Sequence, residues 1–188
     1  MCGIVGYIGD REAADFLMDG LAKLEYRGYD SAGIAVYNDG AIAVRKKAGR
    51  LVNLAEEVKA HPVVGTLGIG HTRWATHGGP SDVNAHPHTD EKGNFAIVHN
   101  GIIENYMELK EELLKKGYHF KSETDTEVVA HLCADMYDGD FTSTVRKVLA
   151  RLRGSYSLVF MCKFEPDKII CSKKDNPLIV GLGQGENY

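Results

Sequence analysis

The chain has 188 residues, with 44% hydrophobic and 26% charged side chains, which is ordinary for one globular domain with a sizeable core. Its formal net charge of -4 leaves no basic surplus for nucleic acid or an anionic membrane surface. No apolar run approaches the ~20 residues of a membrane span, and no secretory signal pattern is visible. We therefore expect a cytoplasmic protein with neither nucleic-acid nor membrane partners.

Hydrophobic periodicity and turn residues divide the chain into short strands and helices. Residues 2–8 alternate as a strand, with even-numbered side chains on one face and odd-numbered ones on the other. Further strands are expected over 31–37, 41–46, 66–72, 94–99, 156–164, 168–172 and 178–182, and helices over 11–25, 51–61, 106–116, 124–137 and 142–152.

Three local signals support these elements. Asp10 is expected to cap the first helix, Asn38-Asp39-Gly40 to turn a hairpin, and Thr124 with Glu127 to form a capping box. The hairpin and the grouped helices favour the α+β class, in which helices cover antiparallel sheets, over alternating βαβ units.

The four cysteines, Cys2, Cys133, Cys162 and Cys171, contain no Cys-x-x-Cys pair. Their spacing favours neither a zinc knuckle nor a redox motif, and free thiols in a reducing compartment are the simplest interpretation. The last three lie in apolar stretches and are expected to pack as small hydrophobic side chains.

Cys2 follows the initiator methionine, and its side chain is small enough for aminopeptidases to remove Met1. Removal would give one residue a thiol nucleophile and a free α-amine, whose ordinary pKa of roughly 7.7–8.0 leaves a neutral fraction near pH 7. Such an amine can take the thiol proton, as in N-terminal nucleophile enzymes. The alternative is a frayed terminal residue, which the apolar alternation over 2–8 argues against. Retention of Met1 would leave Cys2 without the amine and disable the mechanism.

Two polar loops offer binding groups. Residues 25–33 combine charge, aromatic rings and glycine, and taken alone they are more typical of an ordinary turn closed by Asp30. Residues 71–79 carry Arg73, whose planar fork suits a carboxylate, and the only Trp of the chain, Trp74. A ligand site and a surface loop with Trp74 in the core both remain open.

The segment His99-Asn100-Gly101 stands at the end of a predicted strand. Amide hydrolysis passes through a tetrahedral oxyanion, and an Asn side chain with a nearby backbone N–H can supply the donors it needs. Asn-Gly is also the commonest turn dipeptide, so the pattern alone favours a turn. Taken alone, Asp125 is more typical of a negative charge in the first turn of a helix, where it interacts favourably with the helix dipole. Its carboxylate could also bind a substrate ammonium.

A zinc site is the rival interpretation for His86-Pro87-His88-Thr89-Asp90, which has the His-x-His-x-Asp spacing of metallo-β-lactamase-like hydrolases. Glu91 stands where that pattern has another His, and no strong second ligand cluster follows. We therefore interpret the segment as a polar loop and expect no metal.

Five motifs occur together and in order: Cys2-Gly3-Ile4-Val5-Gly6, Arg27-Gly28-Tyr29-Asp30-Ser31-Ala32-Gly33, His71-Thr72-Arg73-Trp74-Ala75-Thr76-His77-Gly78, His99-Asn100-Gly101 and Ser122-Glu123-Thr124-Asp125-Thr126-Glu127. This set resembles the N-terminal glutaminase domain of the glutamine–fructose-6-phosphate aminotransferases, which are class II glutamine amidotransferases with the N-terminal nucleophile fold. The resemblance covers essentially the whole chain and implies a four-layer αββα sandwich of antiparallel sheets.

The resemblance also implies catalytic roles. Cys2 would attack the glutamine side-chain amide with its own α-amine as base, and a γ-glutamyl thioester would form, release ammonia and then react with water. Asn100 and the Gly101 N–H would form the oxyanion hole. Arg27 would belong to the loop that lines the nucleophile.

Substrate contacts follow from the same resemblance. Arg73 would hold the α-carboxylate of L-glutamine, and Asp125 its α-ammonium. Gly101, Thr76 and His77 would add contacts, and Trp74 would form a mobile cover. No cofactor or metal is implied, and the ammonia would serve glucosamine 6-phosphate synthesis from fructose 6-phosphate.

The domain organisation departs from the resembled family. No sugar-phosphate isomerase domain is recognisable, and we expect residues 1–188 to be a glutaminase domain truncated at its C-terminal end, homodimeric when full length. Two alternatives stay open. One is an N-terminal-Cys hydrolase of another amide, and the other is a catalytically silent module that keeps Met1.

Overall fold

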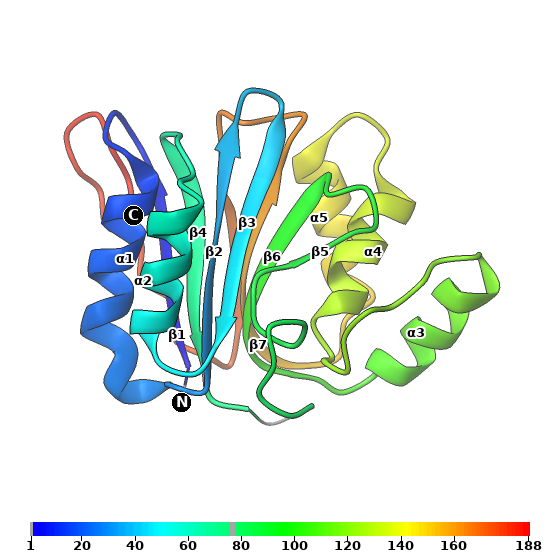
Figure 1. Ribbon diagram of the computed structural model, residues 1–188. Coiled ribbons are helices and arrows are strands. Elements are labelled where there is room, and N and C mark those ends of the chain that lie inside the picture. The colour runs from blue at the N-terminus through cyan, green and yellow to red at the C-terminus, as the bar shows by residue number, and fades with distance from the viewer. Residues whose placement is uncertain (1, 76–77) are drawn as a thin grey trace.

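Two antiparallel four-stranded sheets form the centre of the computed structural model, which describes residues 2–75 and 78–188 (Figure 1). The first sheet has the order β1-β4-β2-β3, and the second has the order β5-β6-β7-β8. Their bounds are β1 Gly3–Ile8, β2 Ser31–Asn38, β3 Ala41–Ala48, β4 Leu67–Arg73, β5 His88–Thr89, β6 Phe95–Ile103, β7 Gly154–Cys162 and β8 Ile170–Lys174.

Helices cover the outer face of each sheet, as Figure 1 shows. Helices α1 (Ala13–Leu24) and α2 (Leu51–Ala60) pack on the first sheet, and α3 (Tyr106–Lys115), α4 (Glu127–Met136) and α5 (Phe141–Leu149) pack on the second. A single 3-10 turn, η1 (Glu25–Arg27), follows α1. The four layers confirm the expected α+β class and its αββα arrangement.

The inner faces of the two sheets meet in a dry core of mostly small and β-branched side chains. Its buried members are Ala35, Leu67, Ile69, Ala96, Val98, Val159 and Met161. Because strand side chains alternate, Ile4 and Ile8 of β1 face this inner core while Val5 and Tyr7 face α1. The alternation predicted from the sequence is therefore confirmed, and it directs the start of β1 toward the second sheet.

Two capping predictions are wrong. Helix α1 begins after Glu12, without a side-chain cap, so Asp10 does not cap it. Glu127 does not reach back to Thr124; its carboxylate accepts the N–H groups of Lys121 and Ser122 at 2.9 and 2.7 Å, and the Ser122 hydroxyl at 2.6 Å. The predicted capping box does not form, because the Glu127 carboxylate accepts hydrogen bonds from the preceding loop and not from the start of its own helix.

The strand predicted over 178–182 is also wrong. The last residues pair with themselves across a turn, since Gly181 and Tyr188 exchange backbone hydrogen bonds of 2.5 and 3.0 Å. Asn187 then exchanges backbone hydrogen bonds of 3.0 and 2.8 Å with Ile8 at the outer edge of β1. The apolar side chain of Ile179 consequently stays 90% exposed instead of entering a sheet. The two-residue strand β5 was not predicted because it is too short to show a period.

No helix within the described ranges is long and apolar enough to cross a membrane.

Candidate active site around Cys2

A cavity of about 1090 Å³ opens beside the start of β1, the end of β4 and the Asn100-Gly101 part of β6. Antiparallel pairing of Gly3 with Thr72 brings the first two of these segments together, although they lie far apart in sequence. Every proposed site residue within the described ranges lines this cavity: Cys2, Arg27, Arg73, Trp74, Asn100, Gly101 and Asp125. Thr76 and His77 lie outside the described residues.

Cys2 is half-buried at the wall of this cavity. Its Sγ accepts the backbone N–H of Trp74 at 3.1 Å and lies 3.6 Å from the Trp74 carbonyl oxygen. Burial raises the pKa of the Cys2 thiol above its ordinary value, and the Trp74 N–H opposes this only in part. The sulfur is therefore a protonated thiol at neutral pH, and reaction as a nucleophile requires a base.

The side-chain amide of Asn100 lies against Cys2. Its Nδ2 donates to the Cys2 carbonyl oxygen at 3.2 Å, and its Oδ1 lies 2.8 Å from Nε2 of His71. A carbonyl oxygen only accepts, so the contact with Cys2 determines which way the amide faces. The backbone oxygen of Asn100 in turn accepts from the Asn176 side chain at 3.2 Å. Three other segments of the chain thus hold Asn100 in one orientation.

Gly101 has to be glycine at its position. Its φ of 124° lies in the left-handed region, and a Cβ atom there would stand 2.0 Å from the backbone oxygen of Ser155. At this point β6 approaches β7 closely, and Asn100 and Gly101 both line the cavity. A side chain here would displace the proposed oxyanion donors together.

Arg73 is buried at the end of β4, with 4% of its surface exposed. Its Nη2 donates to the Gly78 oxygen at 3.0 Å and its Nη1 to the Gly79 oxygen at 3.4 Å. Nη1 also lies 3.8 Å from Oδ1 of Asp30. The guanidinium therefore has a structural task, holding the backbone at Gly78 and Gly79, besides any contact with a ligand.

Asp30 is a site residue that sequence reasoning assigned to a local turn. Its carboxylate instead accepts the N–H of Ala75, 45 residues away, and the hydroxyl of Ser31 at 3.0 Å. Its backbone N–H donates to the Arg73 oxygen at 3.2 Å. Asp30 thereby joins the two polar loops, and only the pairing of β2 with β4 could have revealed this.

Asp125 is buried and precedes α4, so it is not a first-turn residue of that helix as the helix-dipole interpretation required. Its Oδ2 accepts the backbone N–H of Ile103 at 2.7 Å, and its Oδ1 lies 3.3 Å from the Thr126 hydroxyl and 3.8 Å from Nδ1 of His99. These donors hold a carboxylate at the cavity wall beside β6.

Trp74 does not lie in the core, as one interpretation of the loop expected. Its side chain is 48% exposed, and its ring meets that of Tyr29 edge-on at 5.3 Å between centroids. Arg27 belongs to η1 and is half-buried against the same cavity. Both residues thus line the cavity with side chains that are partly exposed.

Buried histidines behind Asn100 were not predicted to belong to the site. The ring of His86 stacks on that of His71 at 4.3 Å between centroids, and its Nδ1 accepts the backbone N–H of His99 at 3.3 Å. Burial lowers the pKa of His71 to about 4 and that of His86 well below its ordinary value, so both rings are neutral at pH 7. Both histidines stood in quoted motifs, but no local signal linked them to Asn100.

The zinc interpretation finds no support in this part of the molecule. Asp90 accepts the backbone N–H groups of Asn94 and Phe95 at 2.6 and 2.8 Å, so its carboxylate closes a turn. Across residues 2–75 and 78–188, no group of three His, Cys, Asp or Glu side chains is placed to hold a metal ion. His86 and His88 serve as packing and hydrogen-bonding groups.

Comparison with known proteins shows which family this chain is similar to. A family model described as a glutamine amidotransferase domain matches residues 71–184. The glutamine–fructose-6-phosphate aminotransferases (isomerizing) of Caldanaerobacter subterraneus subsp. tengcongensis, Clostridium tetani and Thermus thermophilus are 58%, 57% and 55% identical over 188 residues. Each alignment covers 100% of this chain and 31% of the relative, so the chain spans about a third of the relatives' length.

Solved structures agree with the sequence relatives. Glutamine phosphoribosylpyrophosphate amidotransferase from B. subtilis, complexed with ADP and GMP, has a TM-score of 0.84 and 28% identity, covering 100% of this chain and 41% of that one. A glutamine aminotransferase class-II domain protein from Silicibacter pomeroyi has a TM-score of 0.61 at 17% identity, over 96% of this chain and 81% of that one, and shares the fold alone. The expected fold class is confirmed.

Proposed function

The chain belongs to the family of glutamine amidotransferase domains, and from this premise we propose that it hydrolyses the side-chain amide of L-glutamine to glutamate and ammonia. The observation that carries the proposal is the contact of Cys2 with the Asn100 amide in a cavity that Arg73 and Asp125 also line. A thiol, an amide donor, a cation and an anion are the groups needed to bind a free amino acid and attack its side-chain amide.

The first half of the reaction is acylation. The Cys2 sulfur adds to the amide carbon, and its proton passes to the α-amine that Met1 removal exposes. Burial of Cys2 makes this base necessary because the thiol is protonated at neutral pH. The oxyanion that forms is stabilised by Nδ2 of Asn100 and the N–H of Gly101. Collapse of the intermediate breaks the C–N bond, and the leaving nitrogen takes the proton and departs as ammonia.

The second half is deacylation. Water adds to the γ-glutamyl thioester, loses its proton to the same amine, and breaks the C–S bond to give glutamate and free Cys2. Throughout both halves Arg73 holds the α-carboxylate and Asp125 the α-ammonium. Thr76 and His77 would add substrate contacts, Trp74 would cover the site, and Arg27 would line the nucleophile. The scheme needs no cofactor or metal.

The full-length protein is a separate proposal, because the chain spans 31% of its relatives' length. We infer that it is cytoplasmic and homodimeric, and that sugar-phosphate isomerase domains use the ammonia to make glucosamine 6-phosphate from fructose 6-phosphate. The names of the curated relatives support the sugar-phosphate part of this inference. The distinguishing assay supplies fructose 6-phosphate to the full-length protein and to residues 1–188 alone; amino sugar is expected from the former only.

Two alternatives are separated by direct measurements. Intact mass reports whether Met1 is present, and a protein that keeps it and does not hydrolyse glutamine would be a silent module. A panel of glutamine, asparagine and N-acylated glutamine tests for another amide. The cationic Arg73 and anionic Asp125 in one cavity favour free glutamine, and equal rates on the N-acylated compound would overturn that choice.

A further inference from the structure

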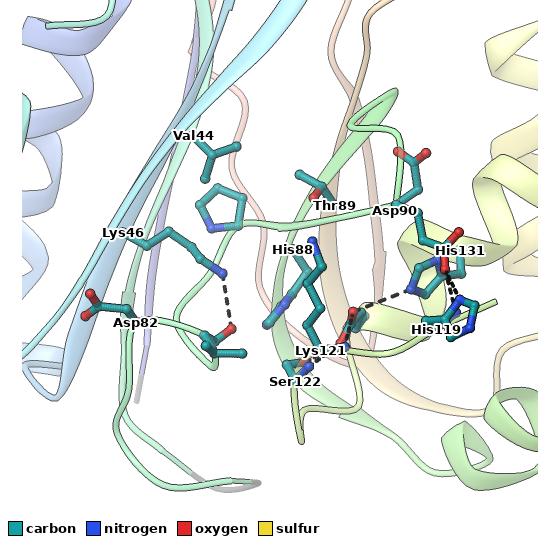
Figure 2. Close-up of a pocket in the computed structure, with 14 residues that line it drawn as sticks. Val44, Lys46, Asp82, His88, Thr89, Asp90, His119, Lys121, Ser122 and His131 are labelled. Atoms are coloured by element: carbon teal, nitrogen blue, oxygen red, sulfur yellow. Dashed lines mark hydrogen bonds and ion pairs between the residues drawn. The ribbon is translucent and has the colours of Figure 1, made fainter. Parts of the chain in front are cut away.

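A second cavity, of about 410 Å³, lies between β3 and the loop that leads into α4 (Figure 2). Among the described residues it shares no lining residue with the Cys2 cavity. His88 stands in the wall between the two, since its Nε2 lies 3.0 Å from the hydroxyl of Thr124, which lines the Cys2 cavity. This volume lies within the range of small-molecule sites, about 300–1000 Å³.

Two lysines supply positive charge to this cavity. Lys46 extends from β3 into it, and Lys121 lies on the facing loop, as Figure 2 shows. The Lys46 ammonium donates to the Val83 carbonyl oxygen at 3.1 Å, and within the described part of the chain neither lysine forms an ion pair within 4.0 Å. Burial lowers the pKa of Lys46 to about 8, and the charge of Lys121 acts in the same direction. The charges of Glu127 and Asp82 attract the Lys46 ammonium, but neither carboxylate forms an ion pair with it within 4.0 Å, and burial outweighs both.

Two carboxylates of the lining are committed to donors in the protein itself. Glu127 accepts two backbone N–H groups and the Ser122 hydroxyl, and Asp90 accepts the N–H groups of Lys92, Asn94 and Phe95 at 3.2, 2.6 and 2.8 Å. Their oxygens therefore close loops, and do not serve as partners for the two lysines.

The other two carboxylates of the lining are engaged in the same way. Glu91 accepts the N–H of His119 at 2.6 Å and contacts its Nδ1 at 2.9 Å. Asp82 accepts the N–H of Ala48 at 2.7 Å and the Lys47 ammonium at 3.1 Å. Glu127 and Asp82 raise the pKa of Lys46 without contacting its ammonium, and burial lowers that pKa by more.

His131 adds a donor or acceptor to the opposite wall. It is 1% exposed, lines the cavity from α4, and its Nδ1 has no hydrogen-bond partner among the described residues. A buried ring nitrogen without a partner is costly, and a ligand or water in the cavity would satisfy it. The groups that a ligand could engage here are therefore two ammonium groups that form no ion pair within the described ranges, and Nδ1 of His131.

We propose that this cavity binds a small oxyanion, the carboxylate or phosphate group of an organic molecule, between the ammonium groups of Lys46 and Lys121, with His131 as a further contact. Ammonium groups bind such oxygens as point charges and need no fixed fork geometry. The volume leaves room for a few carbon atoms beyond the charged group. The site does not depend on glutamine hydrolysis, because its lining excludes Cys2 and Arg73.

The test is a ¹⁵N–¹H NMR titration of the chain with inorganic phosphate and, separately, acetate, at constant ionic strength with chloride as the reference anion. Saturating shifts are expected at the amides of Lys46, Thr89 and Lys121 in at least one arm, and the stronger arm identifies the preferred group. Cys2→Ala should leave these shifts unchanged. Shifts that chloride reproduces, or that do not saturate, would overturn the proposal.

Matched variants separate binding from general charge. Lys46→Met and Lys121→Met should each weaken the affinity for the anion at least tenfold, whereas Lys46→Arg should retain most of it. Lys59→Met removes the same charge from an exposed position on α2 and should have no effect. Equal weakening by Lys59→Met would show nonspecific attraction. If Lys46→Met does not fold, Lys121→Met tests the same site from an exposed position, and unchanged affinity in that variant would overturn the proposal.

Discussion

His71 donates the N–H of its Nε2 to Oδ1 of Asn100 across 2.8 Å, and the same nitrogen lies 3.1 Å from the backbone oxygen of His99. Both partners are acceptors, so the neutral ring carries its proton on Nε2. This contact keeps the Asn100 amide oxygen away from Cys2 and leaves the NH2 group facing it. His71 therefore positions the donor on which the proposed oxyanion hole depends.

Replacement of His71 tests this positioning role. His71→Phe should lower kcat for glutamine tenfold to a hundredfold with little change in KM, somewhat less than the ~10²–10³ cost of deleting an oxyanion donor. His71→Gln, which keeps an N–H donor, should recover part of the loss. Steady-state kinetics would measure kcat and KM, and a thermal melt would control for loss of the fold. A variant with unchanged kcat and a raised KM would place His71 in substrate binding instead.

Cys2 is tested by removal of its sulfur. Cys2→Ala should abolish glutamine hydrolysis, and Cys2→Ser should be severely impaired because a hydroxyl is harder to deprotonate than a thiol. The fold should survive, since among the residues that the structure describes Sγ accepts one hydrogen bond, from Trp74. Circular dichroism would check the fold of each variant, and a glutaminase assay would measure the loss of hydrolysis. Substantial turnover by Cys2→Ala would exclude the thioester mechanism.

Arg73 is tested with a pair of substrates. Arg73→Lys should raise KM for glutamine strongly, because an ammonium cannot form the bidentate fork, and Arg73→Ala should cost several kcal/mol, on the order of the loss when one member of a desolvated pair is deleted. A glutamine analogue without the α-carboxylate should be affected much less. Equal losses on both compounds would mean that Arg73 acts mainly by holding Gly78 and Gly79.

Asp125→Asn separates charge from structure at the ammonium end. The amide oxygen of Asn can still accept the Ile103 N–H, so the melting temperature should change little. KM for glutamine should rise at least tenfold, because the substrate ammonium loses its counter-charge. Calorimetry and kinetics would measure the two effects, and an unchanged KM would show that the ammonium binds elsewhere.

The buried ammonium of Lys46 predicts a pH-dependent stability. Burial lowers its pKa from 10.5 to about 8, so between these values the unfolded chain binds more protons and stability rises with pH. Lys46→Met should therefore be more stable at pH 7, by about 1–2 kcal/mol after discounting for partial exposure, with the gain vanishing as pH passes 10.5. Melts from pH 7 upward, with Lys59→Met as control, would show it. A less stable Lys46→Met would mean that attraction by Glu127 and Asp82 exceeds the cost of burial.

Local features of the sequence were sufficient for most elements, whereas the proposed site residues came from the resemblance carried by five motifs in order. The hairpin at Asn38-Asp39-Gly40 is an example: Asp39 and Gly40 adopt φ of 44° and 82°, which these residue types tolerate. Helix α2 begins at Leu51 as predicted and ends at Ala60, one residue before the predicted end. Such features depend on hydrogen bonds and side-chain spacing within a few residues, and these are readable from the sequence.

The relationships that assemble the site are long-range, and only the tertiary structure decided them. His71 and Asn100 are 29 residues apart, and Asp30 and Ala75 are 45 apart. The pairing of β2 with β4 brings Asp30 to Ala75, whereas the packing of β4 in the first sheet against β6 in the second brings His71 to Asn100. No local period encodes either the register or the packing. The failed capping box has a local cause: Glu127 accepts the N–H groups of Lys121 and Ser122, six and five residues earlier, and does not reach back to Thr124. The sequence by itself determined which groups are available, and the pairing of strands and the packing of the two sheets decided which of them meet.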